Sequence, residues 1–281
     1  MDWHQLHRRI RDRLESLTSP EEAQSEARIW LEDGFQRSLD WLALHGTETV
    51  SSEDQQQLQS WLDRRSLREP CQYLWGRTRF RERSFRCDAR VLIPRPETEL
   101  LIEEALARRS ADRPLQVWDV GTGSGILAIT LALETSWIVT ASDLSPEALA
   151  CAQQNALDHR APVHFIESDL LEAASGSIDM VVSNLPYVDP AIQSQLQPEL
   201  HFEPSLALYA SEQGEGLITR LLRDGRRRSI PLMLLEIGAG QADRLRSLAH
   251  TLGWPQAETL RDWNGHDRVL VVEDPSVKTD K

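Results

Sequence analysis

The sequence predicts an α/β protein: a doubly wound, Rossmann-like sheet with helices on both faces, preceded by a small N-terminal helical bundle and a β-hairpin connector. Three observations support this fold class. Apolar residues recur every three or four positions up to about residue 66, aromatic residues are scattered among arginines over 70–93, and short apolar runs then alternate with amphipathic stretches. The 281 residues suffice for a large domain with a small companion.

The N-terminal stretch, residues 1–68, is expected to form a helical domain. A stripe from Trp3 to Leu17 predicts the first helix, and Ser19 to Glu22 forms a capping box that predicts the start of the second. A third apolar cluster ends near Gly46, and Ser52 to Gln55 predicts the cap of a fourth helix. We expect the four tryptophans of this bundle to anchor its core.

Residues 69–95 are expected to form the β-hairpin connector, because the helical period stops at Pro70 and aromatic residues follow around Gly76. Arginines crowd this region. They form either a solvated basic face, which we favour, or a surface for an acidic partner. The cluster comprises Arg64, Arg65, Arg68, Arg77, Arg79, Arg81, Arg83 and Arg86.

Residues 96–275 are expected to form the main domain, with a flexible tail over 276–281. Glu97 and Glu99 suit the first turn of a helix that continues through Ala105. Strands are predicted at 115–120, 137–143, 163–168, 179–184, 231–238, 257–263 and 267–274, with helices at 126–134 and 146–157. Such alternation indicates a mostly parallel sheet.

Composition excludes some functions. With 31 Lys and Arg against 44 Asp and Glu, the formal charge is −13, which opposes nonspecific binding to nucleic acid. No apolar run approaches the roughly 18 residues that span a bilayer. Three cysteines without a C-x-x-C pair are typical of reduced thiols rather than a metal site. We therefore expect a cytoplasmic protein that binds no metal, no membrane and no nucleic acid directly.

A glycine-rich turn separates the first predicted strand of the main domain from the next helix. It reads Asp119-Val-Gly121-Thr122-Gly123-Ser124-Gly125. Glycines allow the backbone to bend sharply and to approach a ligand closely. The following Ile126 breaks the dinucleotide pattern, and no lysine makes a phosphate-binding loop. The alternative is a tight turn without a ligand.

Two acidic residues end the next predicted strands. Asp143 lies 22 positions after Gly121, where a carboxylate can accept hydrogen bonds from both ribose hydroxyls of an adenosine group. Asp169, followed by Leu170, ends the strand after that. These residues are expected to flank an adenine, although Asp169 alone is equally typical of a helix cap or a solvated loop.

The tetrapeptide Asn184-Leu185-Pro186-Tyr187 follows the strand at 179–184 and indicates the chemistry. An amide nitrogen is a poor nucleophile because its lone pair is delocalised into the carbonyl. The Asn184 side-chain oxygen and the Leu185 carbonyl could hold such an NH2 group with its lone pair toward a sulfonium methyl group. Pro186 fixes the turn, and Tyr187 offers a face for stacking. An ordinary turn is the alternative.

Four segments together resemble the PrmC/HemK family, the glutamine-N5 methyltransferases of peptide chain release factors. They are 92–99 (LIPRPETE), 119–125, 183–188 (SNLPYV) and 265–268 (GHDR). The resemblance implies a class I S-adenosylmethionine-dependent methyltransferase whose substrate is the glutamine of the Gly-Gly-Gln motif in class I release factors. It also implies that the N-terminal bundle grips the release factor.

The resemblance further implies that the glycine turn lines the cofactor site and that residues 184–187 hold the glutamine. The expected cofactor contacts are Asp119, Gly121, Thr122, Gly123, Ser124, Gly125, Asp143, Leu144, Asp169, Leu170 and Asn184. Two positions depart from the family pattern. Leu185 replaces the first proline of the family tetrapeptide, but the acceptor at that position is a backbone carbonyl, so the chemistry should be retained. Leu170 stands where relatives often carry an aromatic residue.

Two other functions remain open from sequence. An N6-adenine-type nucleic-acid methyltransferase acts on a similar planar nitrogen with a similar loop, and a noncatalytic adaptor could retain the cofactor fold. We expect a monomer, and a stretch at 199–208 that closes over the site. His201, His266 and the other histidines lack partners for catalysis and are expected to be structural. Glu236 ends a strand, but the sequence assigns it no role.

Overall fold

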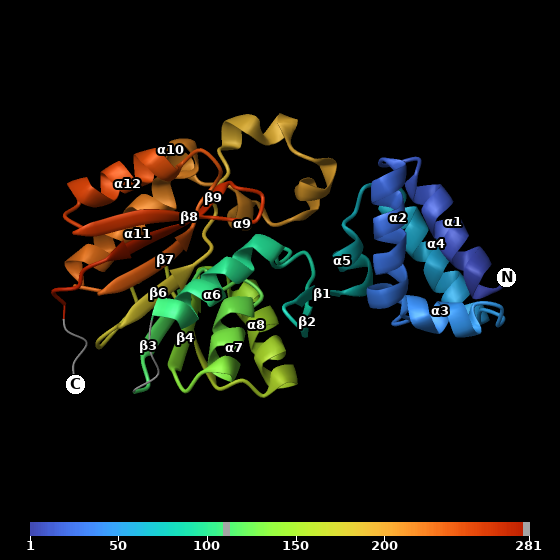
Figure 1. The fold of residues 1–281 in the computed structure, drawn as a ribbon, viewed down its shortest axis with the longest axis horizontal. Helices are drawn as coiled ribbons and strands as arrows, with labels where there is room; N and C mark the ends of the chain where they lie inside the picture. Colours follow the sequence, from blue (N-terminus) through green and yellow to red (C-terminus); the bar gives the residue numbers. More distant parts are fainter. Residues whose placement is uncertain (109–112, 278–281) are drawn as a thin grey trace. The chain divides into compact units, whose positions relative to one another are not determined.

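The computed structural model describes residues 1–108 and 113–277 (Figure 1). They divide into two compact units. The first comprises Met1–Thr78 together with Gln197–Phe202, and the second comprises Arg79–Leu196 together with Glu203–Lys281. The predicted boundaries differ, because the first unit extends past residue 68 and includes a segment from far along the chain. Of the expected tail, residues 278–281 lie outside the described part.

The first unit is helical. Its elements are α1 (Trp3–Leu14), α2 (Pro20–Ile29), the π-helical turn η1 (Trp30–Gly34), α3 (Leu39–His45), α4 (Ser52–Ser66) and α5 (Cys71–Trp75), with the 3-10 turn η4 (Pro198–Phe202). The predicted capping box of Ser19 and Glu22 is confirmed. The prediction for α4 was wrong by one residue, since Ser51 rather than Ser52 is the cap that accepts from Asp54 N.

Tryptophans fill the centre of this unit, as predicted. Trp3, Trp30 and Trp61 are buried, whereas Trp41 is partly exposed and lies under the Arg37 guanidinium. Trp30 meets both Trp61 and Trp75 edge to face. Trp75 belongs to α5, so residues 71–75 are a helix of this core and not the start of the connector that the sequence predicted.

The hairpin itself is β1 (Arg77–Phe80) paired with β2 (Arg83–Arg86). Most of the crowded arginines pair with acids of this same chain. Arg64 contacts Glu69, Arg65 contacts Glu26 and Glu199, Arg68 contacts Glu199, Arg81 and Arg83 contact Glu134, and Arg86 contacts Asp158. Internal pairing therefore accounts for much of the basic cluster.

The second unit is built on a sheet with strand order β5-β4-β3-β6-β7-β9-β8. The strands are β3 (Gln116–Val120), β4 (Ile138–Asp143), β5 (Val163–Glu167), β6 (Met180–Ser183), β7 (Leu232–Glu236), β8 (Gln256–Arg261) and β9 (Asp267–Glu273). The pairs from β5 to β7 are parallel, and β9 is antiparallel to both β7 and β8. The predicted mostly parallel, doubly wound sheet is confirmed.

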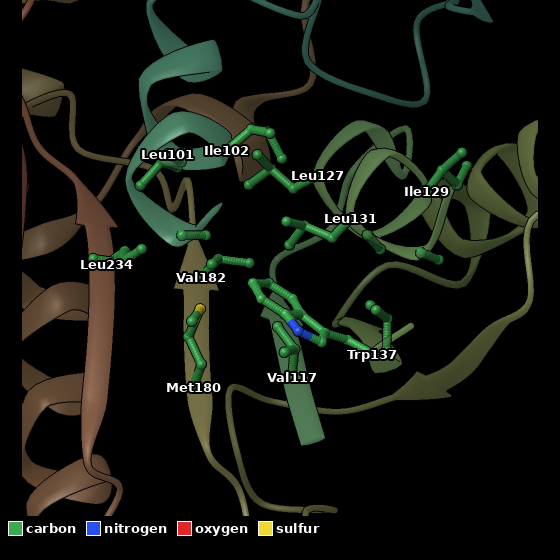
Figure 2. Packing of buried hydrophobic residues seen from close by; sticks show 14 of the residues in the cluster. Leu101, Ile102, Val117, Leu127, Ile129, Leu131, Trp137, Met180, Val182 and Leu234 are labelled. Carbon is green, nitrogen blue, oxygen red and sulfur yellow. The ribbon is translucent and has the colours of Figure 1, made fainter. Parts of the chain in front are cut away.

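Alternate strand residues face two cores. On one face, α6 (Glu99–Arg108), α7 (Ile126–Glu134) and α8 (Pro146–His159) cover side chains such as Val117, Val182 and Leu234. Figure 2 shows Leu127 and Leu131 of α7 above these strands. On the other face, α11 (Gly216–Arg227) and α12 (Ala242–Thr251) cover Trp118 and Met233. Burial on both sides explains the unbroken apolar runs of these strands.

Shorter elements connect this framework. They are the 3-10 turns η2 (Pro96–Thr98) and η3 (Pro190–Gln195) and the short helices α9 (Ser205–Leu208) and α10 (Ser211–Gly214). Within the described ranges, no helix combines the length and the apolar character needed to cross a membrane.

The strand order reverses on either side of β3, since β4 pairs with one of its edges and β6 with the other. A crevice forms at the carboxyl ends of parallel strands at such a reversal. Of the predicted site residues, Gly121 follows β3, Asp143 ends β4 and Asn184 follows β6, so the fold brings them to one edge of the sheet.

Candidate active site

A cavity of about 270 Å³ lies at this edge within the second unit. Of the sequence-predicted residues, those in its wall are Gly121, Gly123, Asp143, Leu144, Asp169, Leu170, Asn184, Leu185 and Pro186. Those not in its wall are Asp119, Thr122, Ser124, Gly125 and Tyr187. Pro204, Leu206 and Ala207 also line it, so part of the 199–208 stretch borders the cavity. No histidine lines it.

The glycine turn presents backbone rather than side chains to the cavity. The amides of Gly121 and Thr122 donate to the Ser142 carbonyl at 2.8 and 2.9 Å, which ties the turn to the end of β4. Gly121 has φ +74°, and a Cβ there would lie 2.8 Å from Leu185 Cδ2. Gly123 has φ +56°, and a Cβ there would meet nothing within 4 Å. The open space over Gly123 suits a ligand that approaches the backbone.

Asp119 supports the glycine turn through two hydrogen bonds. Its Oδ2 accepts from the Thr122 hydroxyl at 2.6 Å and from the Ala128 amide of α7 at 3.1 Å. The side chain is fully buried, and this burial raises the pKa of Asp119 to about 7. The structure therefore gives Asp119 a supporting position behind the turn, where the sequence predicted a direct cofactor contact.

Asp143 stands at the end of β4 with its carboxylate against the turn. Its Oδ2 accepts from the Gly123 amide and its Oδ1 from the Ser145 amide, both at 2.9 Å. Burial raises the pKa of Asp143, while these backbone donors oppose the rise. Each carboxylate oxygen retains a further lone pair, so the group can still accept from a pair of vicinal hydroxyls. This geometry suits a ligand that carries two vicinal hydroxyls, such as a ribose.

Asp169 and Leu170 form the neighbouring wall. Asp169 Oδ2 pairs with Arg220 Nη2 at 2.8 Å, which holds the carboxylate in place. Leu170 adopts φ +50°, a conformation uncommon outside glycine, and its carbonyl accepts from the Ser168 hydroxyl at 3.0 Å. The buried Leu170 side chain gives this wall an apolar face.

Asn184 and Leu185 both line the cavity, and they carry two hydrogen-bond acceptors, the Asn184 side-chain oxygen and the Leu185 carbonyl. Asn184 Nδ2 donates to Thr98 Oγ1 at 3.1 Å, so the other polar atom of the Asn184 amide, Oδ1, is not the one that faces Thr98. Among the described residues, no hydrogen bond engages Asn184 Oδ1 or the Leu185 carbonyl. Because adjacent residues provide both oxygens, together they can receive the two hydrogens of one NH2 group.

Three residues to which the sequence assigned no role, Thr98, Glu236 and Glu203, hold segments of this unit by hydrogen bonds. Thr98 and Glu236 are linked to Asn184 and Tyr187, since the Tyr187 hydroxyl donates to Glu236 Oε1 at 3.1 Å. Glu203 accepts from the Ile93 amide at 3.0 Å and from Arg95, which fixes the segment before η2. The sequence offered one signal for Thr98, its place within the segment 92–99; for Glu236 it offered only the end of a strand.

Two family models match the chain. Residues 96–200 match the methyltransferase small domain, and residues 5–76 match the PrmC N-terminal domain. Among solved structures, the hMettl16 catalytic domain in complex with an RNA hairpin covers 69% of this chain and 75% of its own, with a TM-score of 0.58 and 13% identity. The Thermus thermophilus 16S rRNA N2 G1207 methyltransferase, in complex with AdoMet and guanosine, gives a TM-score of 0.52 at 18% identity, covering 70% of this chain and 49% of its own. At such identities these likenesses establish the fold alone.

Curated relatives are much more similar. A release factor glutamine methyltransferase of Deinococcus radiodurans is 37% identical over 87% of this chain and 89% of its own length. Proteins with the same name from Salmonella typhimurium and Escherichia coli K12 are 35% and 34% identical, over 95% and 93% of this chain and 96% of each relative.

The sheet order, the glycine turn after β3 and the carboxylate at the end of β4 define a class I S-adenosylmethionine-dependent methyltransferase. The similarity to the curated relatives extends through both the helical unit and the sheet. This chain belongs to the family of release factor glutamine methyltransferases. The resemblance seen in the sequence is thereby confirmed.

Proposed function

We propose that this protein transfers a methyl group from S-adenosylmethionine to the side-chain nitrogen, N5, of the glutamine in the Gly-Gly-Gln motif of class I peptide chain release factors. The observation that carries the proposal is the pair of unengaged acceptors, Asn184 Oδ1 and the Leu185 carbonyl, beside the glycine turn. The family of the chain supports the choice of substrate.

The two oxygens would orient an amide nitrogen that is by itself a weak nucleophile. When they accept both hydrogens of the glutamine NH2 group, they fix the plane of the amide, and the nitrogen lone pair, which is perpendicular to that plane, can be directed at the donor methyl. S-adenosylmethionine, when bound, supplies that methyl on a sulfonium; the nitrogen forms the new bond to carbon, and the carbon–sulfur bond electrons remain on sulfur as a neutral thioether. The methylated nitrogen would be cationic; the two acceptors would stabilise its charge, and one of its protons would pass to solvent water.

The remaining predicted residues divide between cofactor and substrate. In this proposal Gly121 and Gly123 let the methionine part approach the backbone, Asp143 accepts from the ribose, and Leu144, Asp169 and Leu170 surround the adenine. Asp119, Thr122, Ser124 and Gly125 support the turn. Pro186 directs the Leu185 carbonyl, and Tyr187, anchored on Glu236, supports the glutamine side of the site.

The partner and its location follow from the same substrate. A release factor acts in the cytoplasm, so we place this enzyme there as a monomer that contacts the release factor directly. We assign the helical unit the task of gripping a part of the release factor away from the glutamine. Light scattering should give the mass of a single chain for the protein alone.

The decisive experiment is peptide mass spectrometry of a class I release factor incubated with this protein and S-adenosylmethionine. We expect a single methyl group on the glutamine of the Gly-Gly-Gln peptide. A release factor in which that glutamine is replaced by glutamate should gain none. Methylation at another residue, or none on the intact release factor, would overturn the proposal.

Asn184→Ala tests the assigned acceptor. We expect methyl transfer to be lost, because the glutamine NH2 group loses one of its two partners, while cofactor affinity falls only modestly because the turn and Asp143 remain. Calorimetric titration with S-adenosylmethionine measures the second quantity. Turnover equal to that of the unmodified protein would reject the role of Asn184.

A further inference from the structure

Asn184 is useful to the proposed reaction only in one of its two amide orientations. Its oxygen must face the glutamine, whereas its NH2 group would repel the glutamine hydrogens. We propose that Thr98 and Glu236 are positioning residues that hold the Asn184 amide with its oxygen toward the cavity. This inference rests on the proposed function and adds residues that touch neither glutamine nor cofactor.

The three side chains form a hydrogen-bonded chain. Asn184 Nδ2 lies 3.1 Å from Thr98 Oγ1, and Thr98 Oγ1 lies 2.7 Å from Glu236 Oε2. Thr98 is fully buried and Glu236 is 1% exposed, so water does not compete for these bonds. The segments are distant in sequence: Thr98 ends η2, Asn184 follows β6, and Glu236 ends β7.

The hydrogen bonds among these three side chains run in one direction, because a threonine hydroxyl carries a single proton. An ionised carboxylate only accepts, so the Thr98 proton is donated to Glu236. The Thr98 oxygen can then only accept, and the group it accepts from is Asn184 Nδ2. A flipped Asn184 amide would place Oδ1 against an oxygen that has no proton to donate. Repulsion between the two oxygens disfavours that state.

The surroundings of Glu236 support this arrangement. The Tyr187 hydroxyl donates to its other oxygen, and the charge of Arg268 on β9 favours the ionised carboxylate. Arg268 is itself held by Asp262 at 3.2 Å. Burial opposes the ionisation of Glu236 most strongly, and the negative charge of Glu97 on η2 also opposes it. The pKa of Glu236 therefore rises to about 6.

Protonation of Glu236 would allow the hydrogen bonds between Glu236, Thr98 and Asn184 to run in either direction. A carboxylic acid can donate to Thr98, and Thr98 can then donate to Asn184 Oδ1 in the flipped amide. Since the group is protonated below its pKa, the flipped state becomes accessible as the pH falls through about 6. The rate of methyl transfer should therefore decline on the acid side of this value.

The test uses three threonine variants in the full-length protein, with release factor and S-adenosylmethionine as substrates. Thr98→Val removes the hydroxyl and should lower kcat by about 10- to 100-fold, as for loss of an oriented catalytic group. Thr98→Ser restores the hydroxyl and should recover kcat to within a few-fold. Thr130→Val is the matched control, because Thr130 is also fully buried but its hydroxyl has no partner among the described residues. It should leave kcat unchanged.

The pH profile separates positioning from a structural role. The unmodified protein should show an acid limb in kcat near pH 6, and Glu236→Gln should lower kcat and lack that limb, because glutamine does not titrate. Affinity for S-adenosylmethionine should stay within about threefold in every variant, a shift below one kcal/mol. Unchanged kcat in Thr98→Val, or an acid limb that persists in Glu236→Gln, would overturn the inference. An unmodified protein that methylates no release factor would instead overturn the proposed function.

Discussion

At the scale of single residues, Leu185 joins two parts of the site. It follows β6, yet its side chain packs into the space beside Gly121, which follows β3. Leu185 Cδ2 would lie 2.8 Å from a Cβ at position 121. The residue that carries the proposed acceptor carbonyl therefore packs its side chain against the glycine turn.

Gly121→Ala should weaken cofactor binding and methyl transfer, because the new Cβ must displace the Leu185 side chain, which lines the cavity. Gly176→Ala is the matched control, since Gly176 has nearly the same φ, +75°, but open space around a Cβ. Both variants should lose about 1–2 kcal/mol of stability from left-handed strain. Titration with S-adenosylmethionine should show an affinity loss only for Gly121→Ala; equal losses in both would contradict the role of the Leu185 contact.

Asp119 gives the unliganded protein a pH-dependent stability. Its pKa is about 7 in the folded state, chiefly through burial and then through the charge of Asp143, against 3.8 as the ordinary value. Between these values the folded state binds more protons than the unfolded state, so this group lowers stability as the pH rises toward 7, with no further loss above. Asp119→Asn does not titrate. In urea unfolding, the free energy of unfolding of Asp119→Asn relative to that of the unmodified protein should increase from pH 5 to pH 7 and then stay constant. A difference that does not change with pH would contradict the ionisation of buried Asp119.

At the scale of elements, the chain between Asn184 and α9 is attached in two places. Glu199 in η4 meets Arg65 of α4 at 2.9 Å within the helical unit. Glu203 is buried in the other unit, where it holds the Ile93 amide. These acids sit in a stretch that the sequence predicted to close over the site. The structure shows that its two halves belong to different units.

Arg65→Ala should destabilise the helical unit strongly. Arg65 is 6% exposed and pairs with both Glu26 and Glu199, so its removal leaves the part-buried Glu26 without its cation and Glu199 with Arg68 alone. Breaking such a buried arrangement costs about 3–5 kcal/mol. Arg11→Ala, which removes an exposed pair with Asp12, should change the unfolding midpoint little. Similar midpoints for the two variants would show that Arg65 is not a structural anchor.

At the scale of the whole molecule, fold does not select the substrate. Solved structures that share this sheet include enzymes complexed with RNA or guanosine, and an adenine amino group is as planar as a glutamine amide. The chain itself carries a formal charge of −13, which opposes the approach of a polyanion.

Labelled S-adenosylmethionine offered with release factor, DNA and RNA together should transfer label to the release factor alone. Transfer should also change little between about 50 and 200 mM salt, because no phosphate backbone has to be neutralised. Label on nucleic acid, with none on the release factor, would favour the adenine-type rival. A protein that binds the cofactor but labels nothing, while Asn184→Ala retains its cellular function, would favour the adaptor.

The sequence by itself determined the strands, their parallel arrangement, the glycine turn and the family, because these depend on local periodicity and on motifs continuous along the chain. It also located Asp143 and Asn184, since residues that end parallel strands must meet at one edge. Only the tertiary structure decided that Asp119 lies behind the turn, that α5 packs with the helical core, and that Thr98 and Glu236 flank Asn184. Those relations join residues from distant segments, and hydrogen-bond direction between them depends on which side chains packing brings within 3 Å of each other.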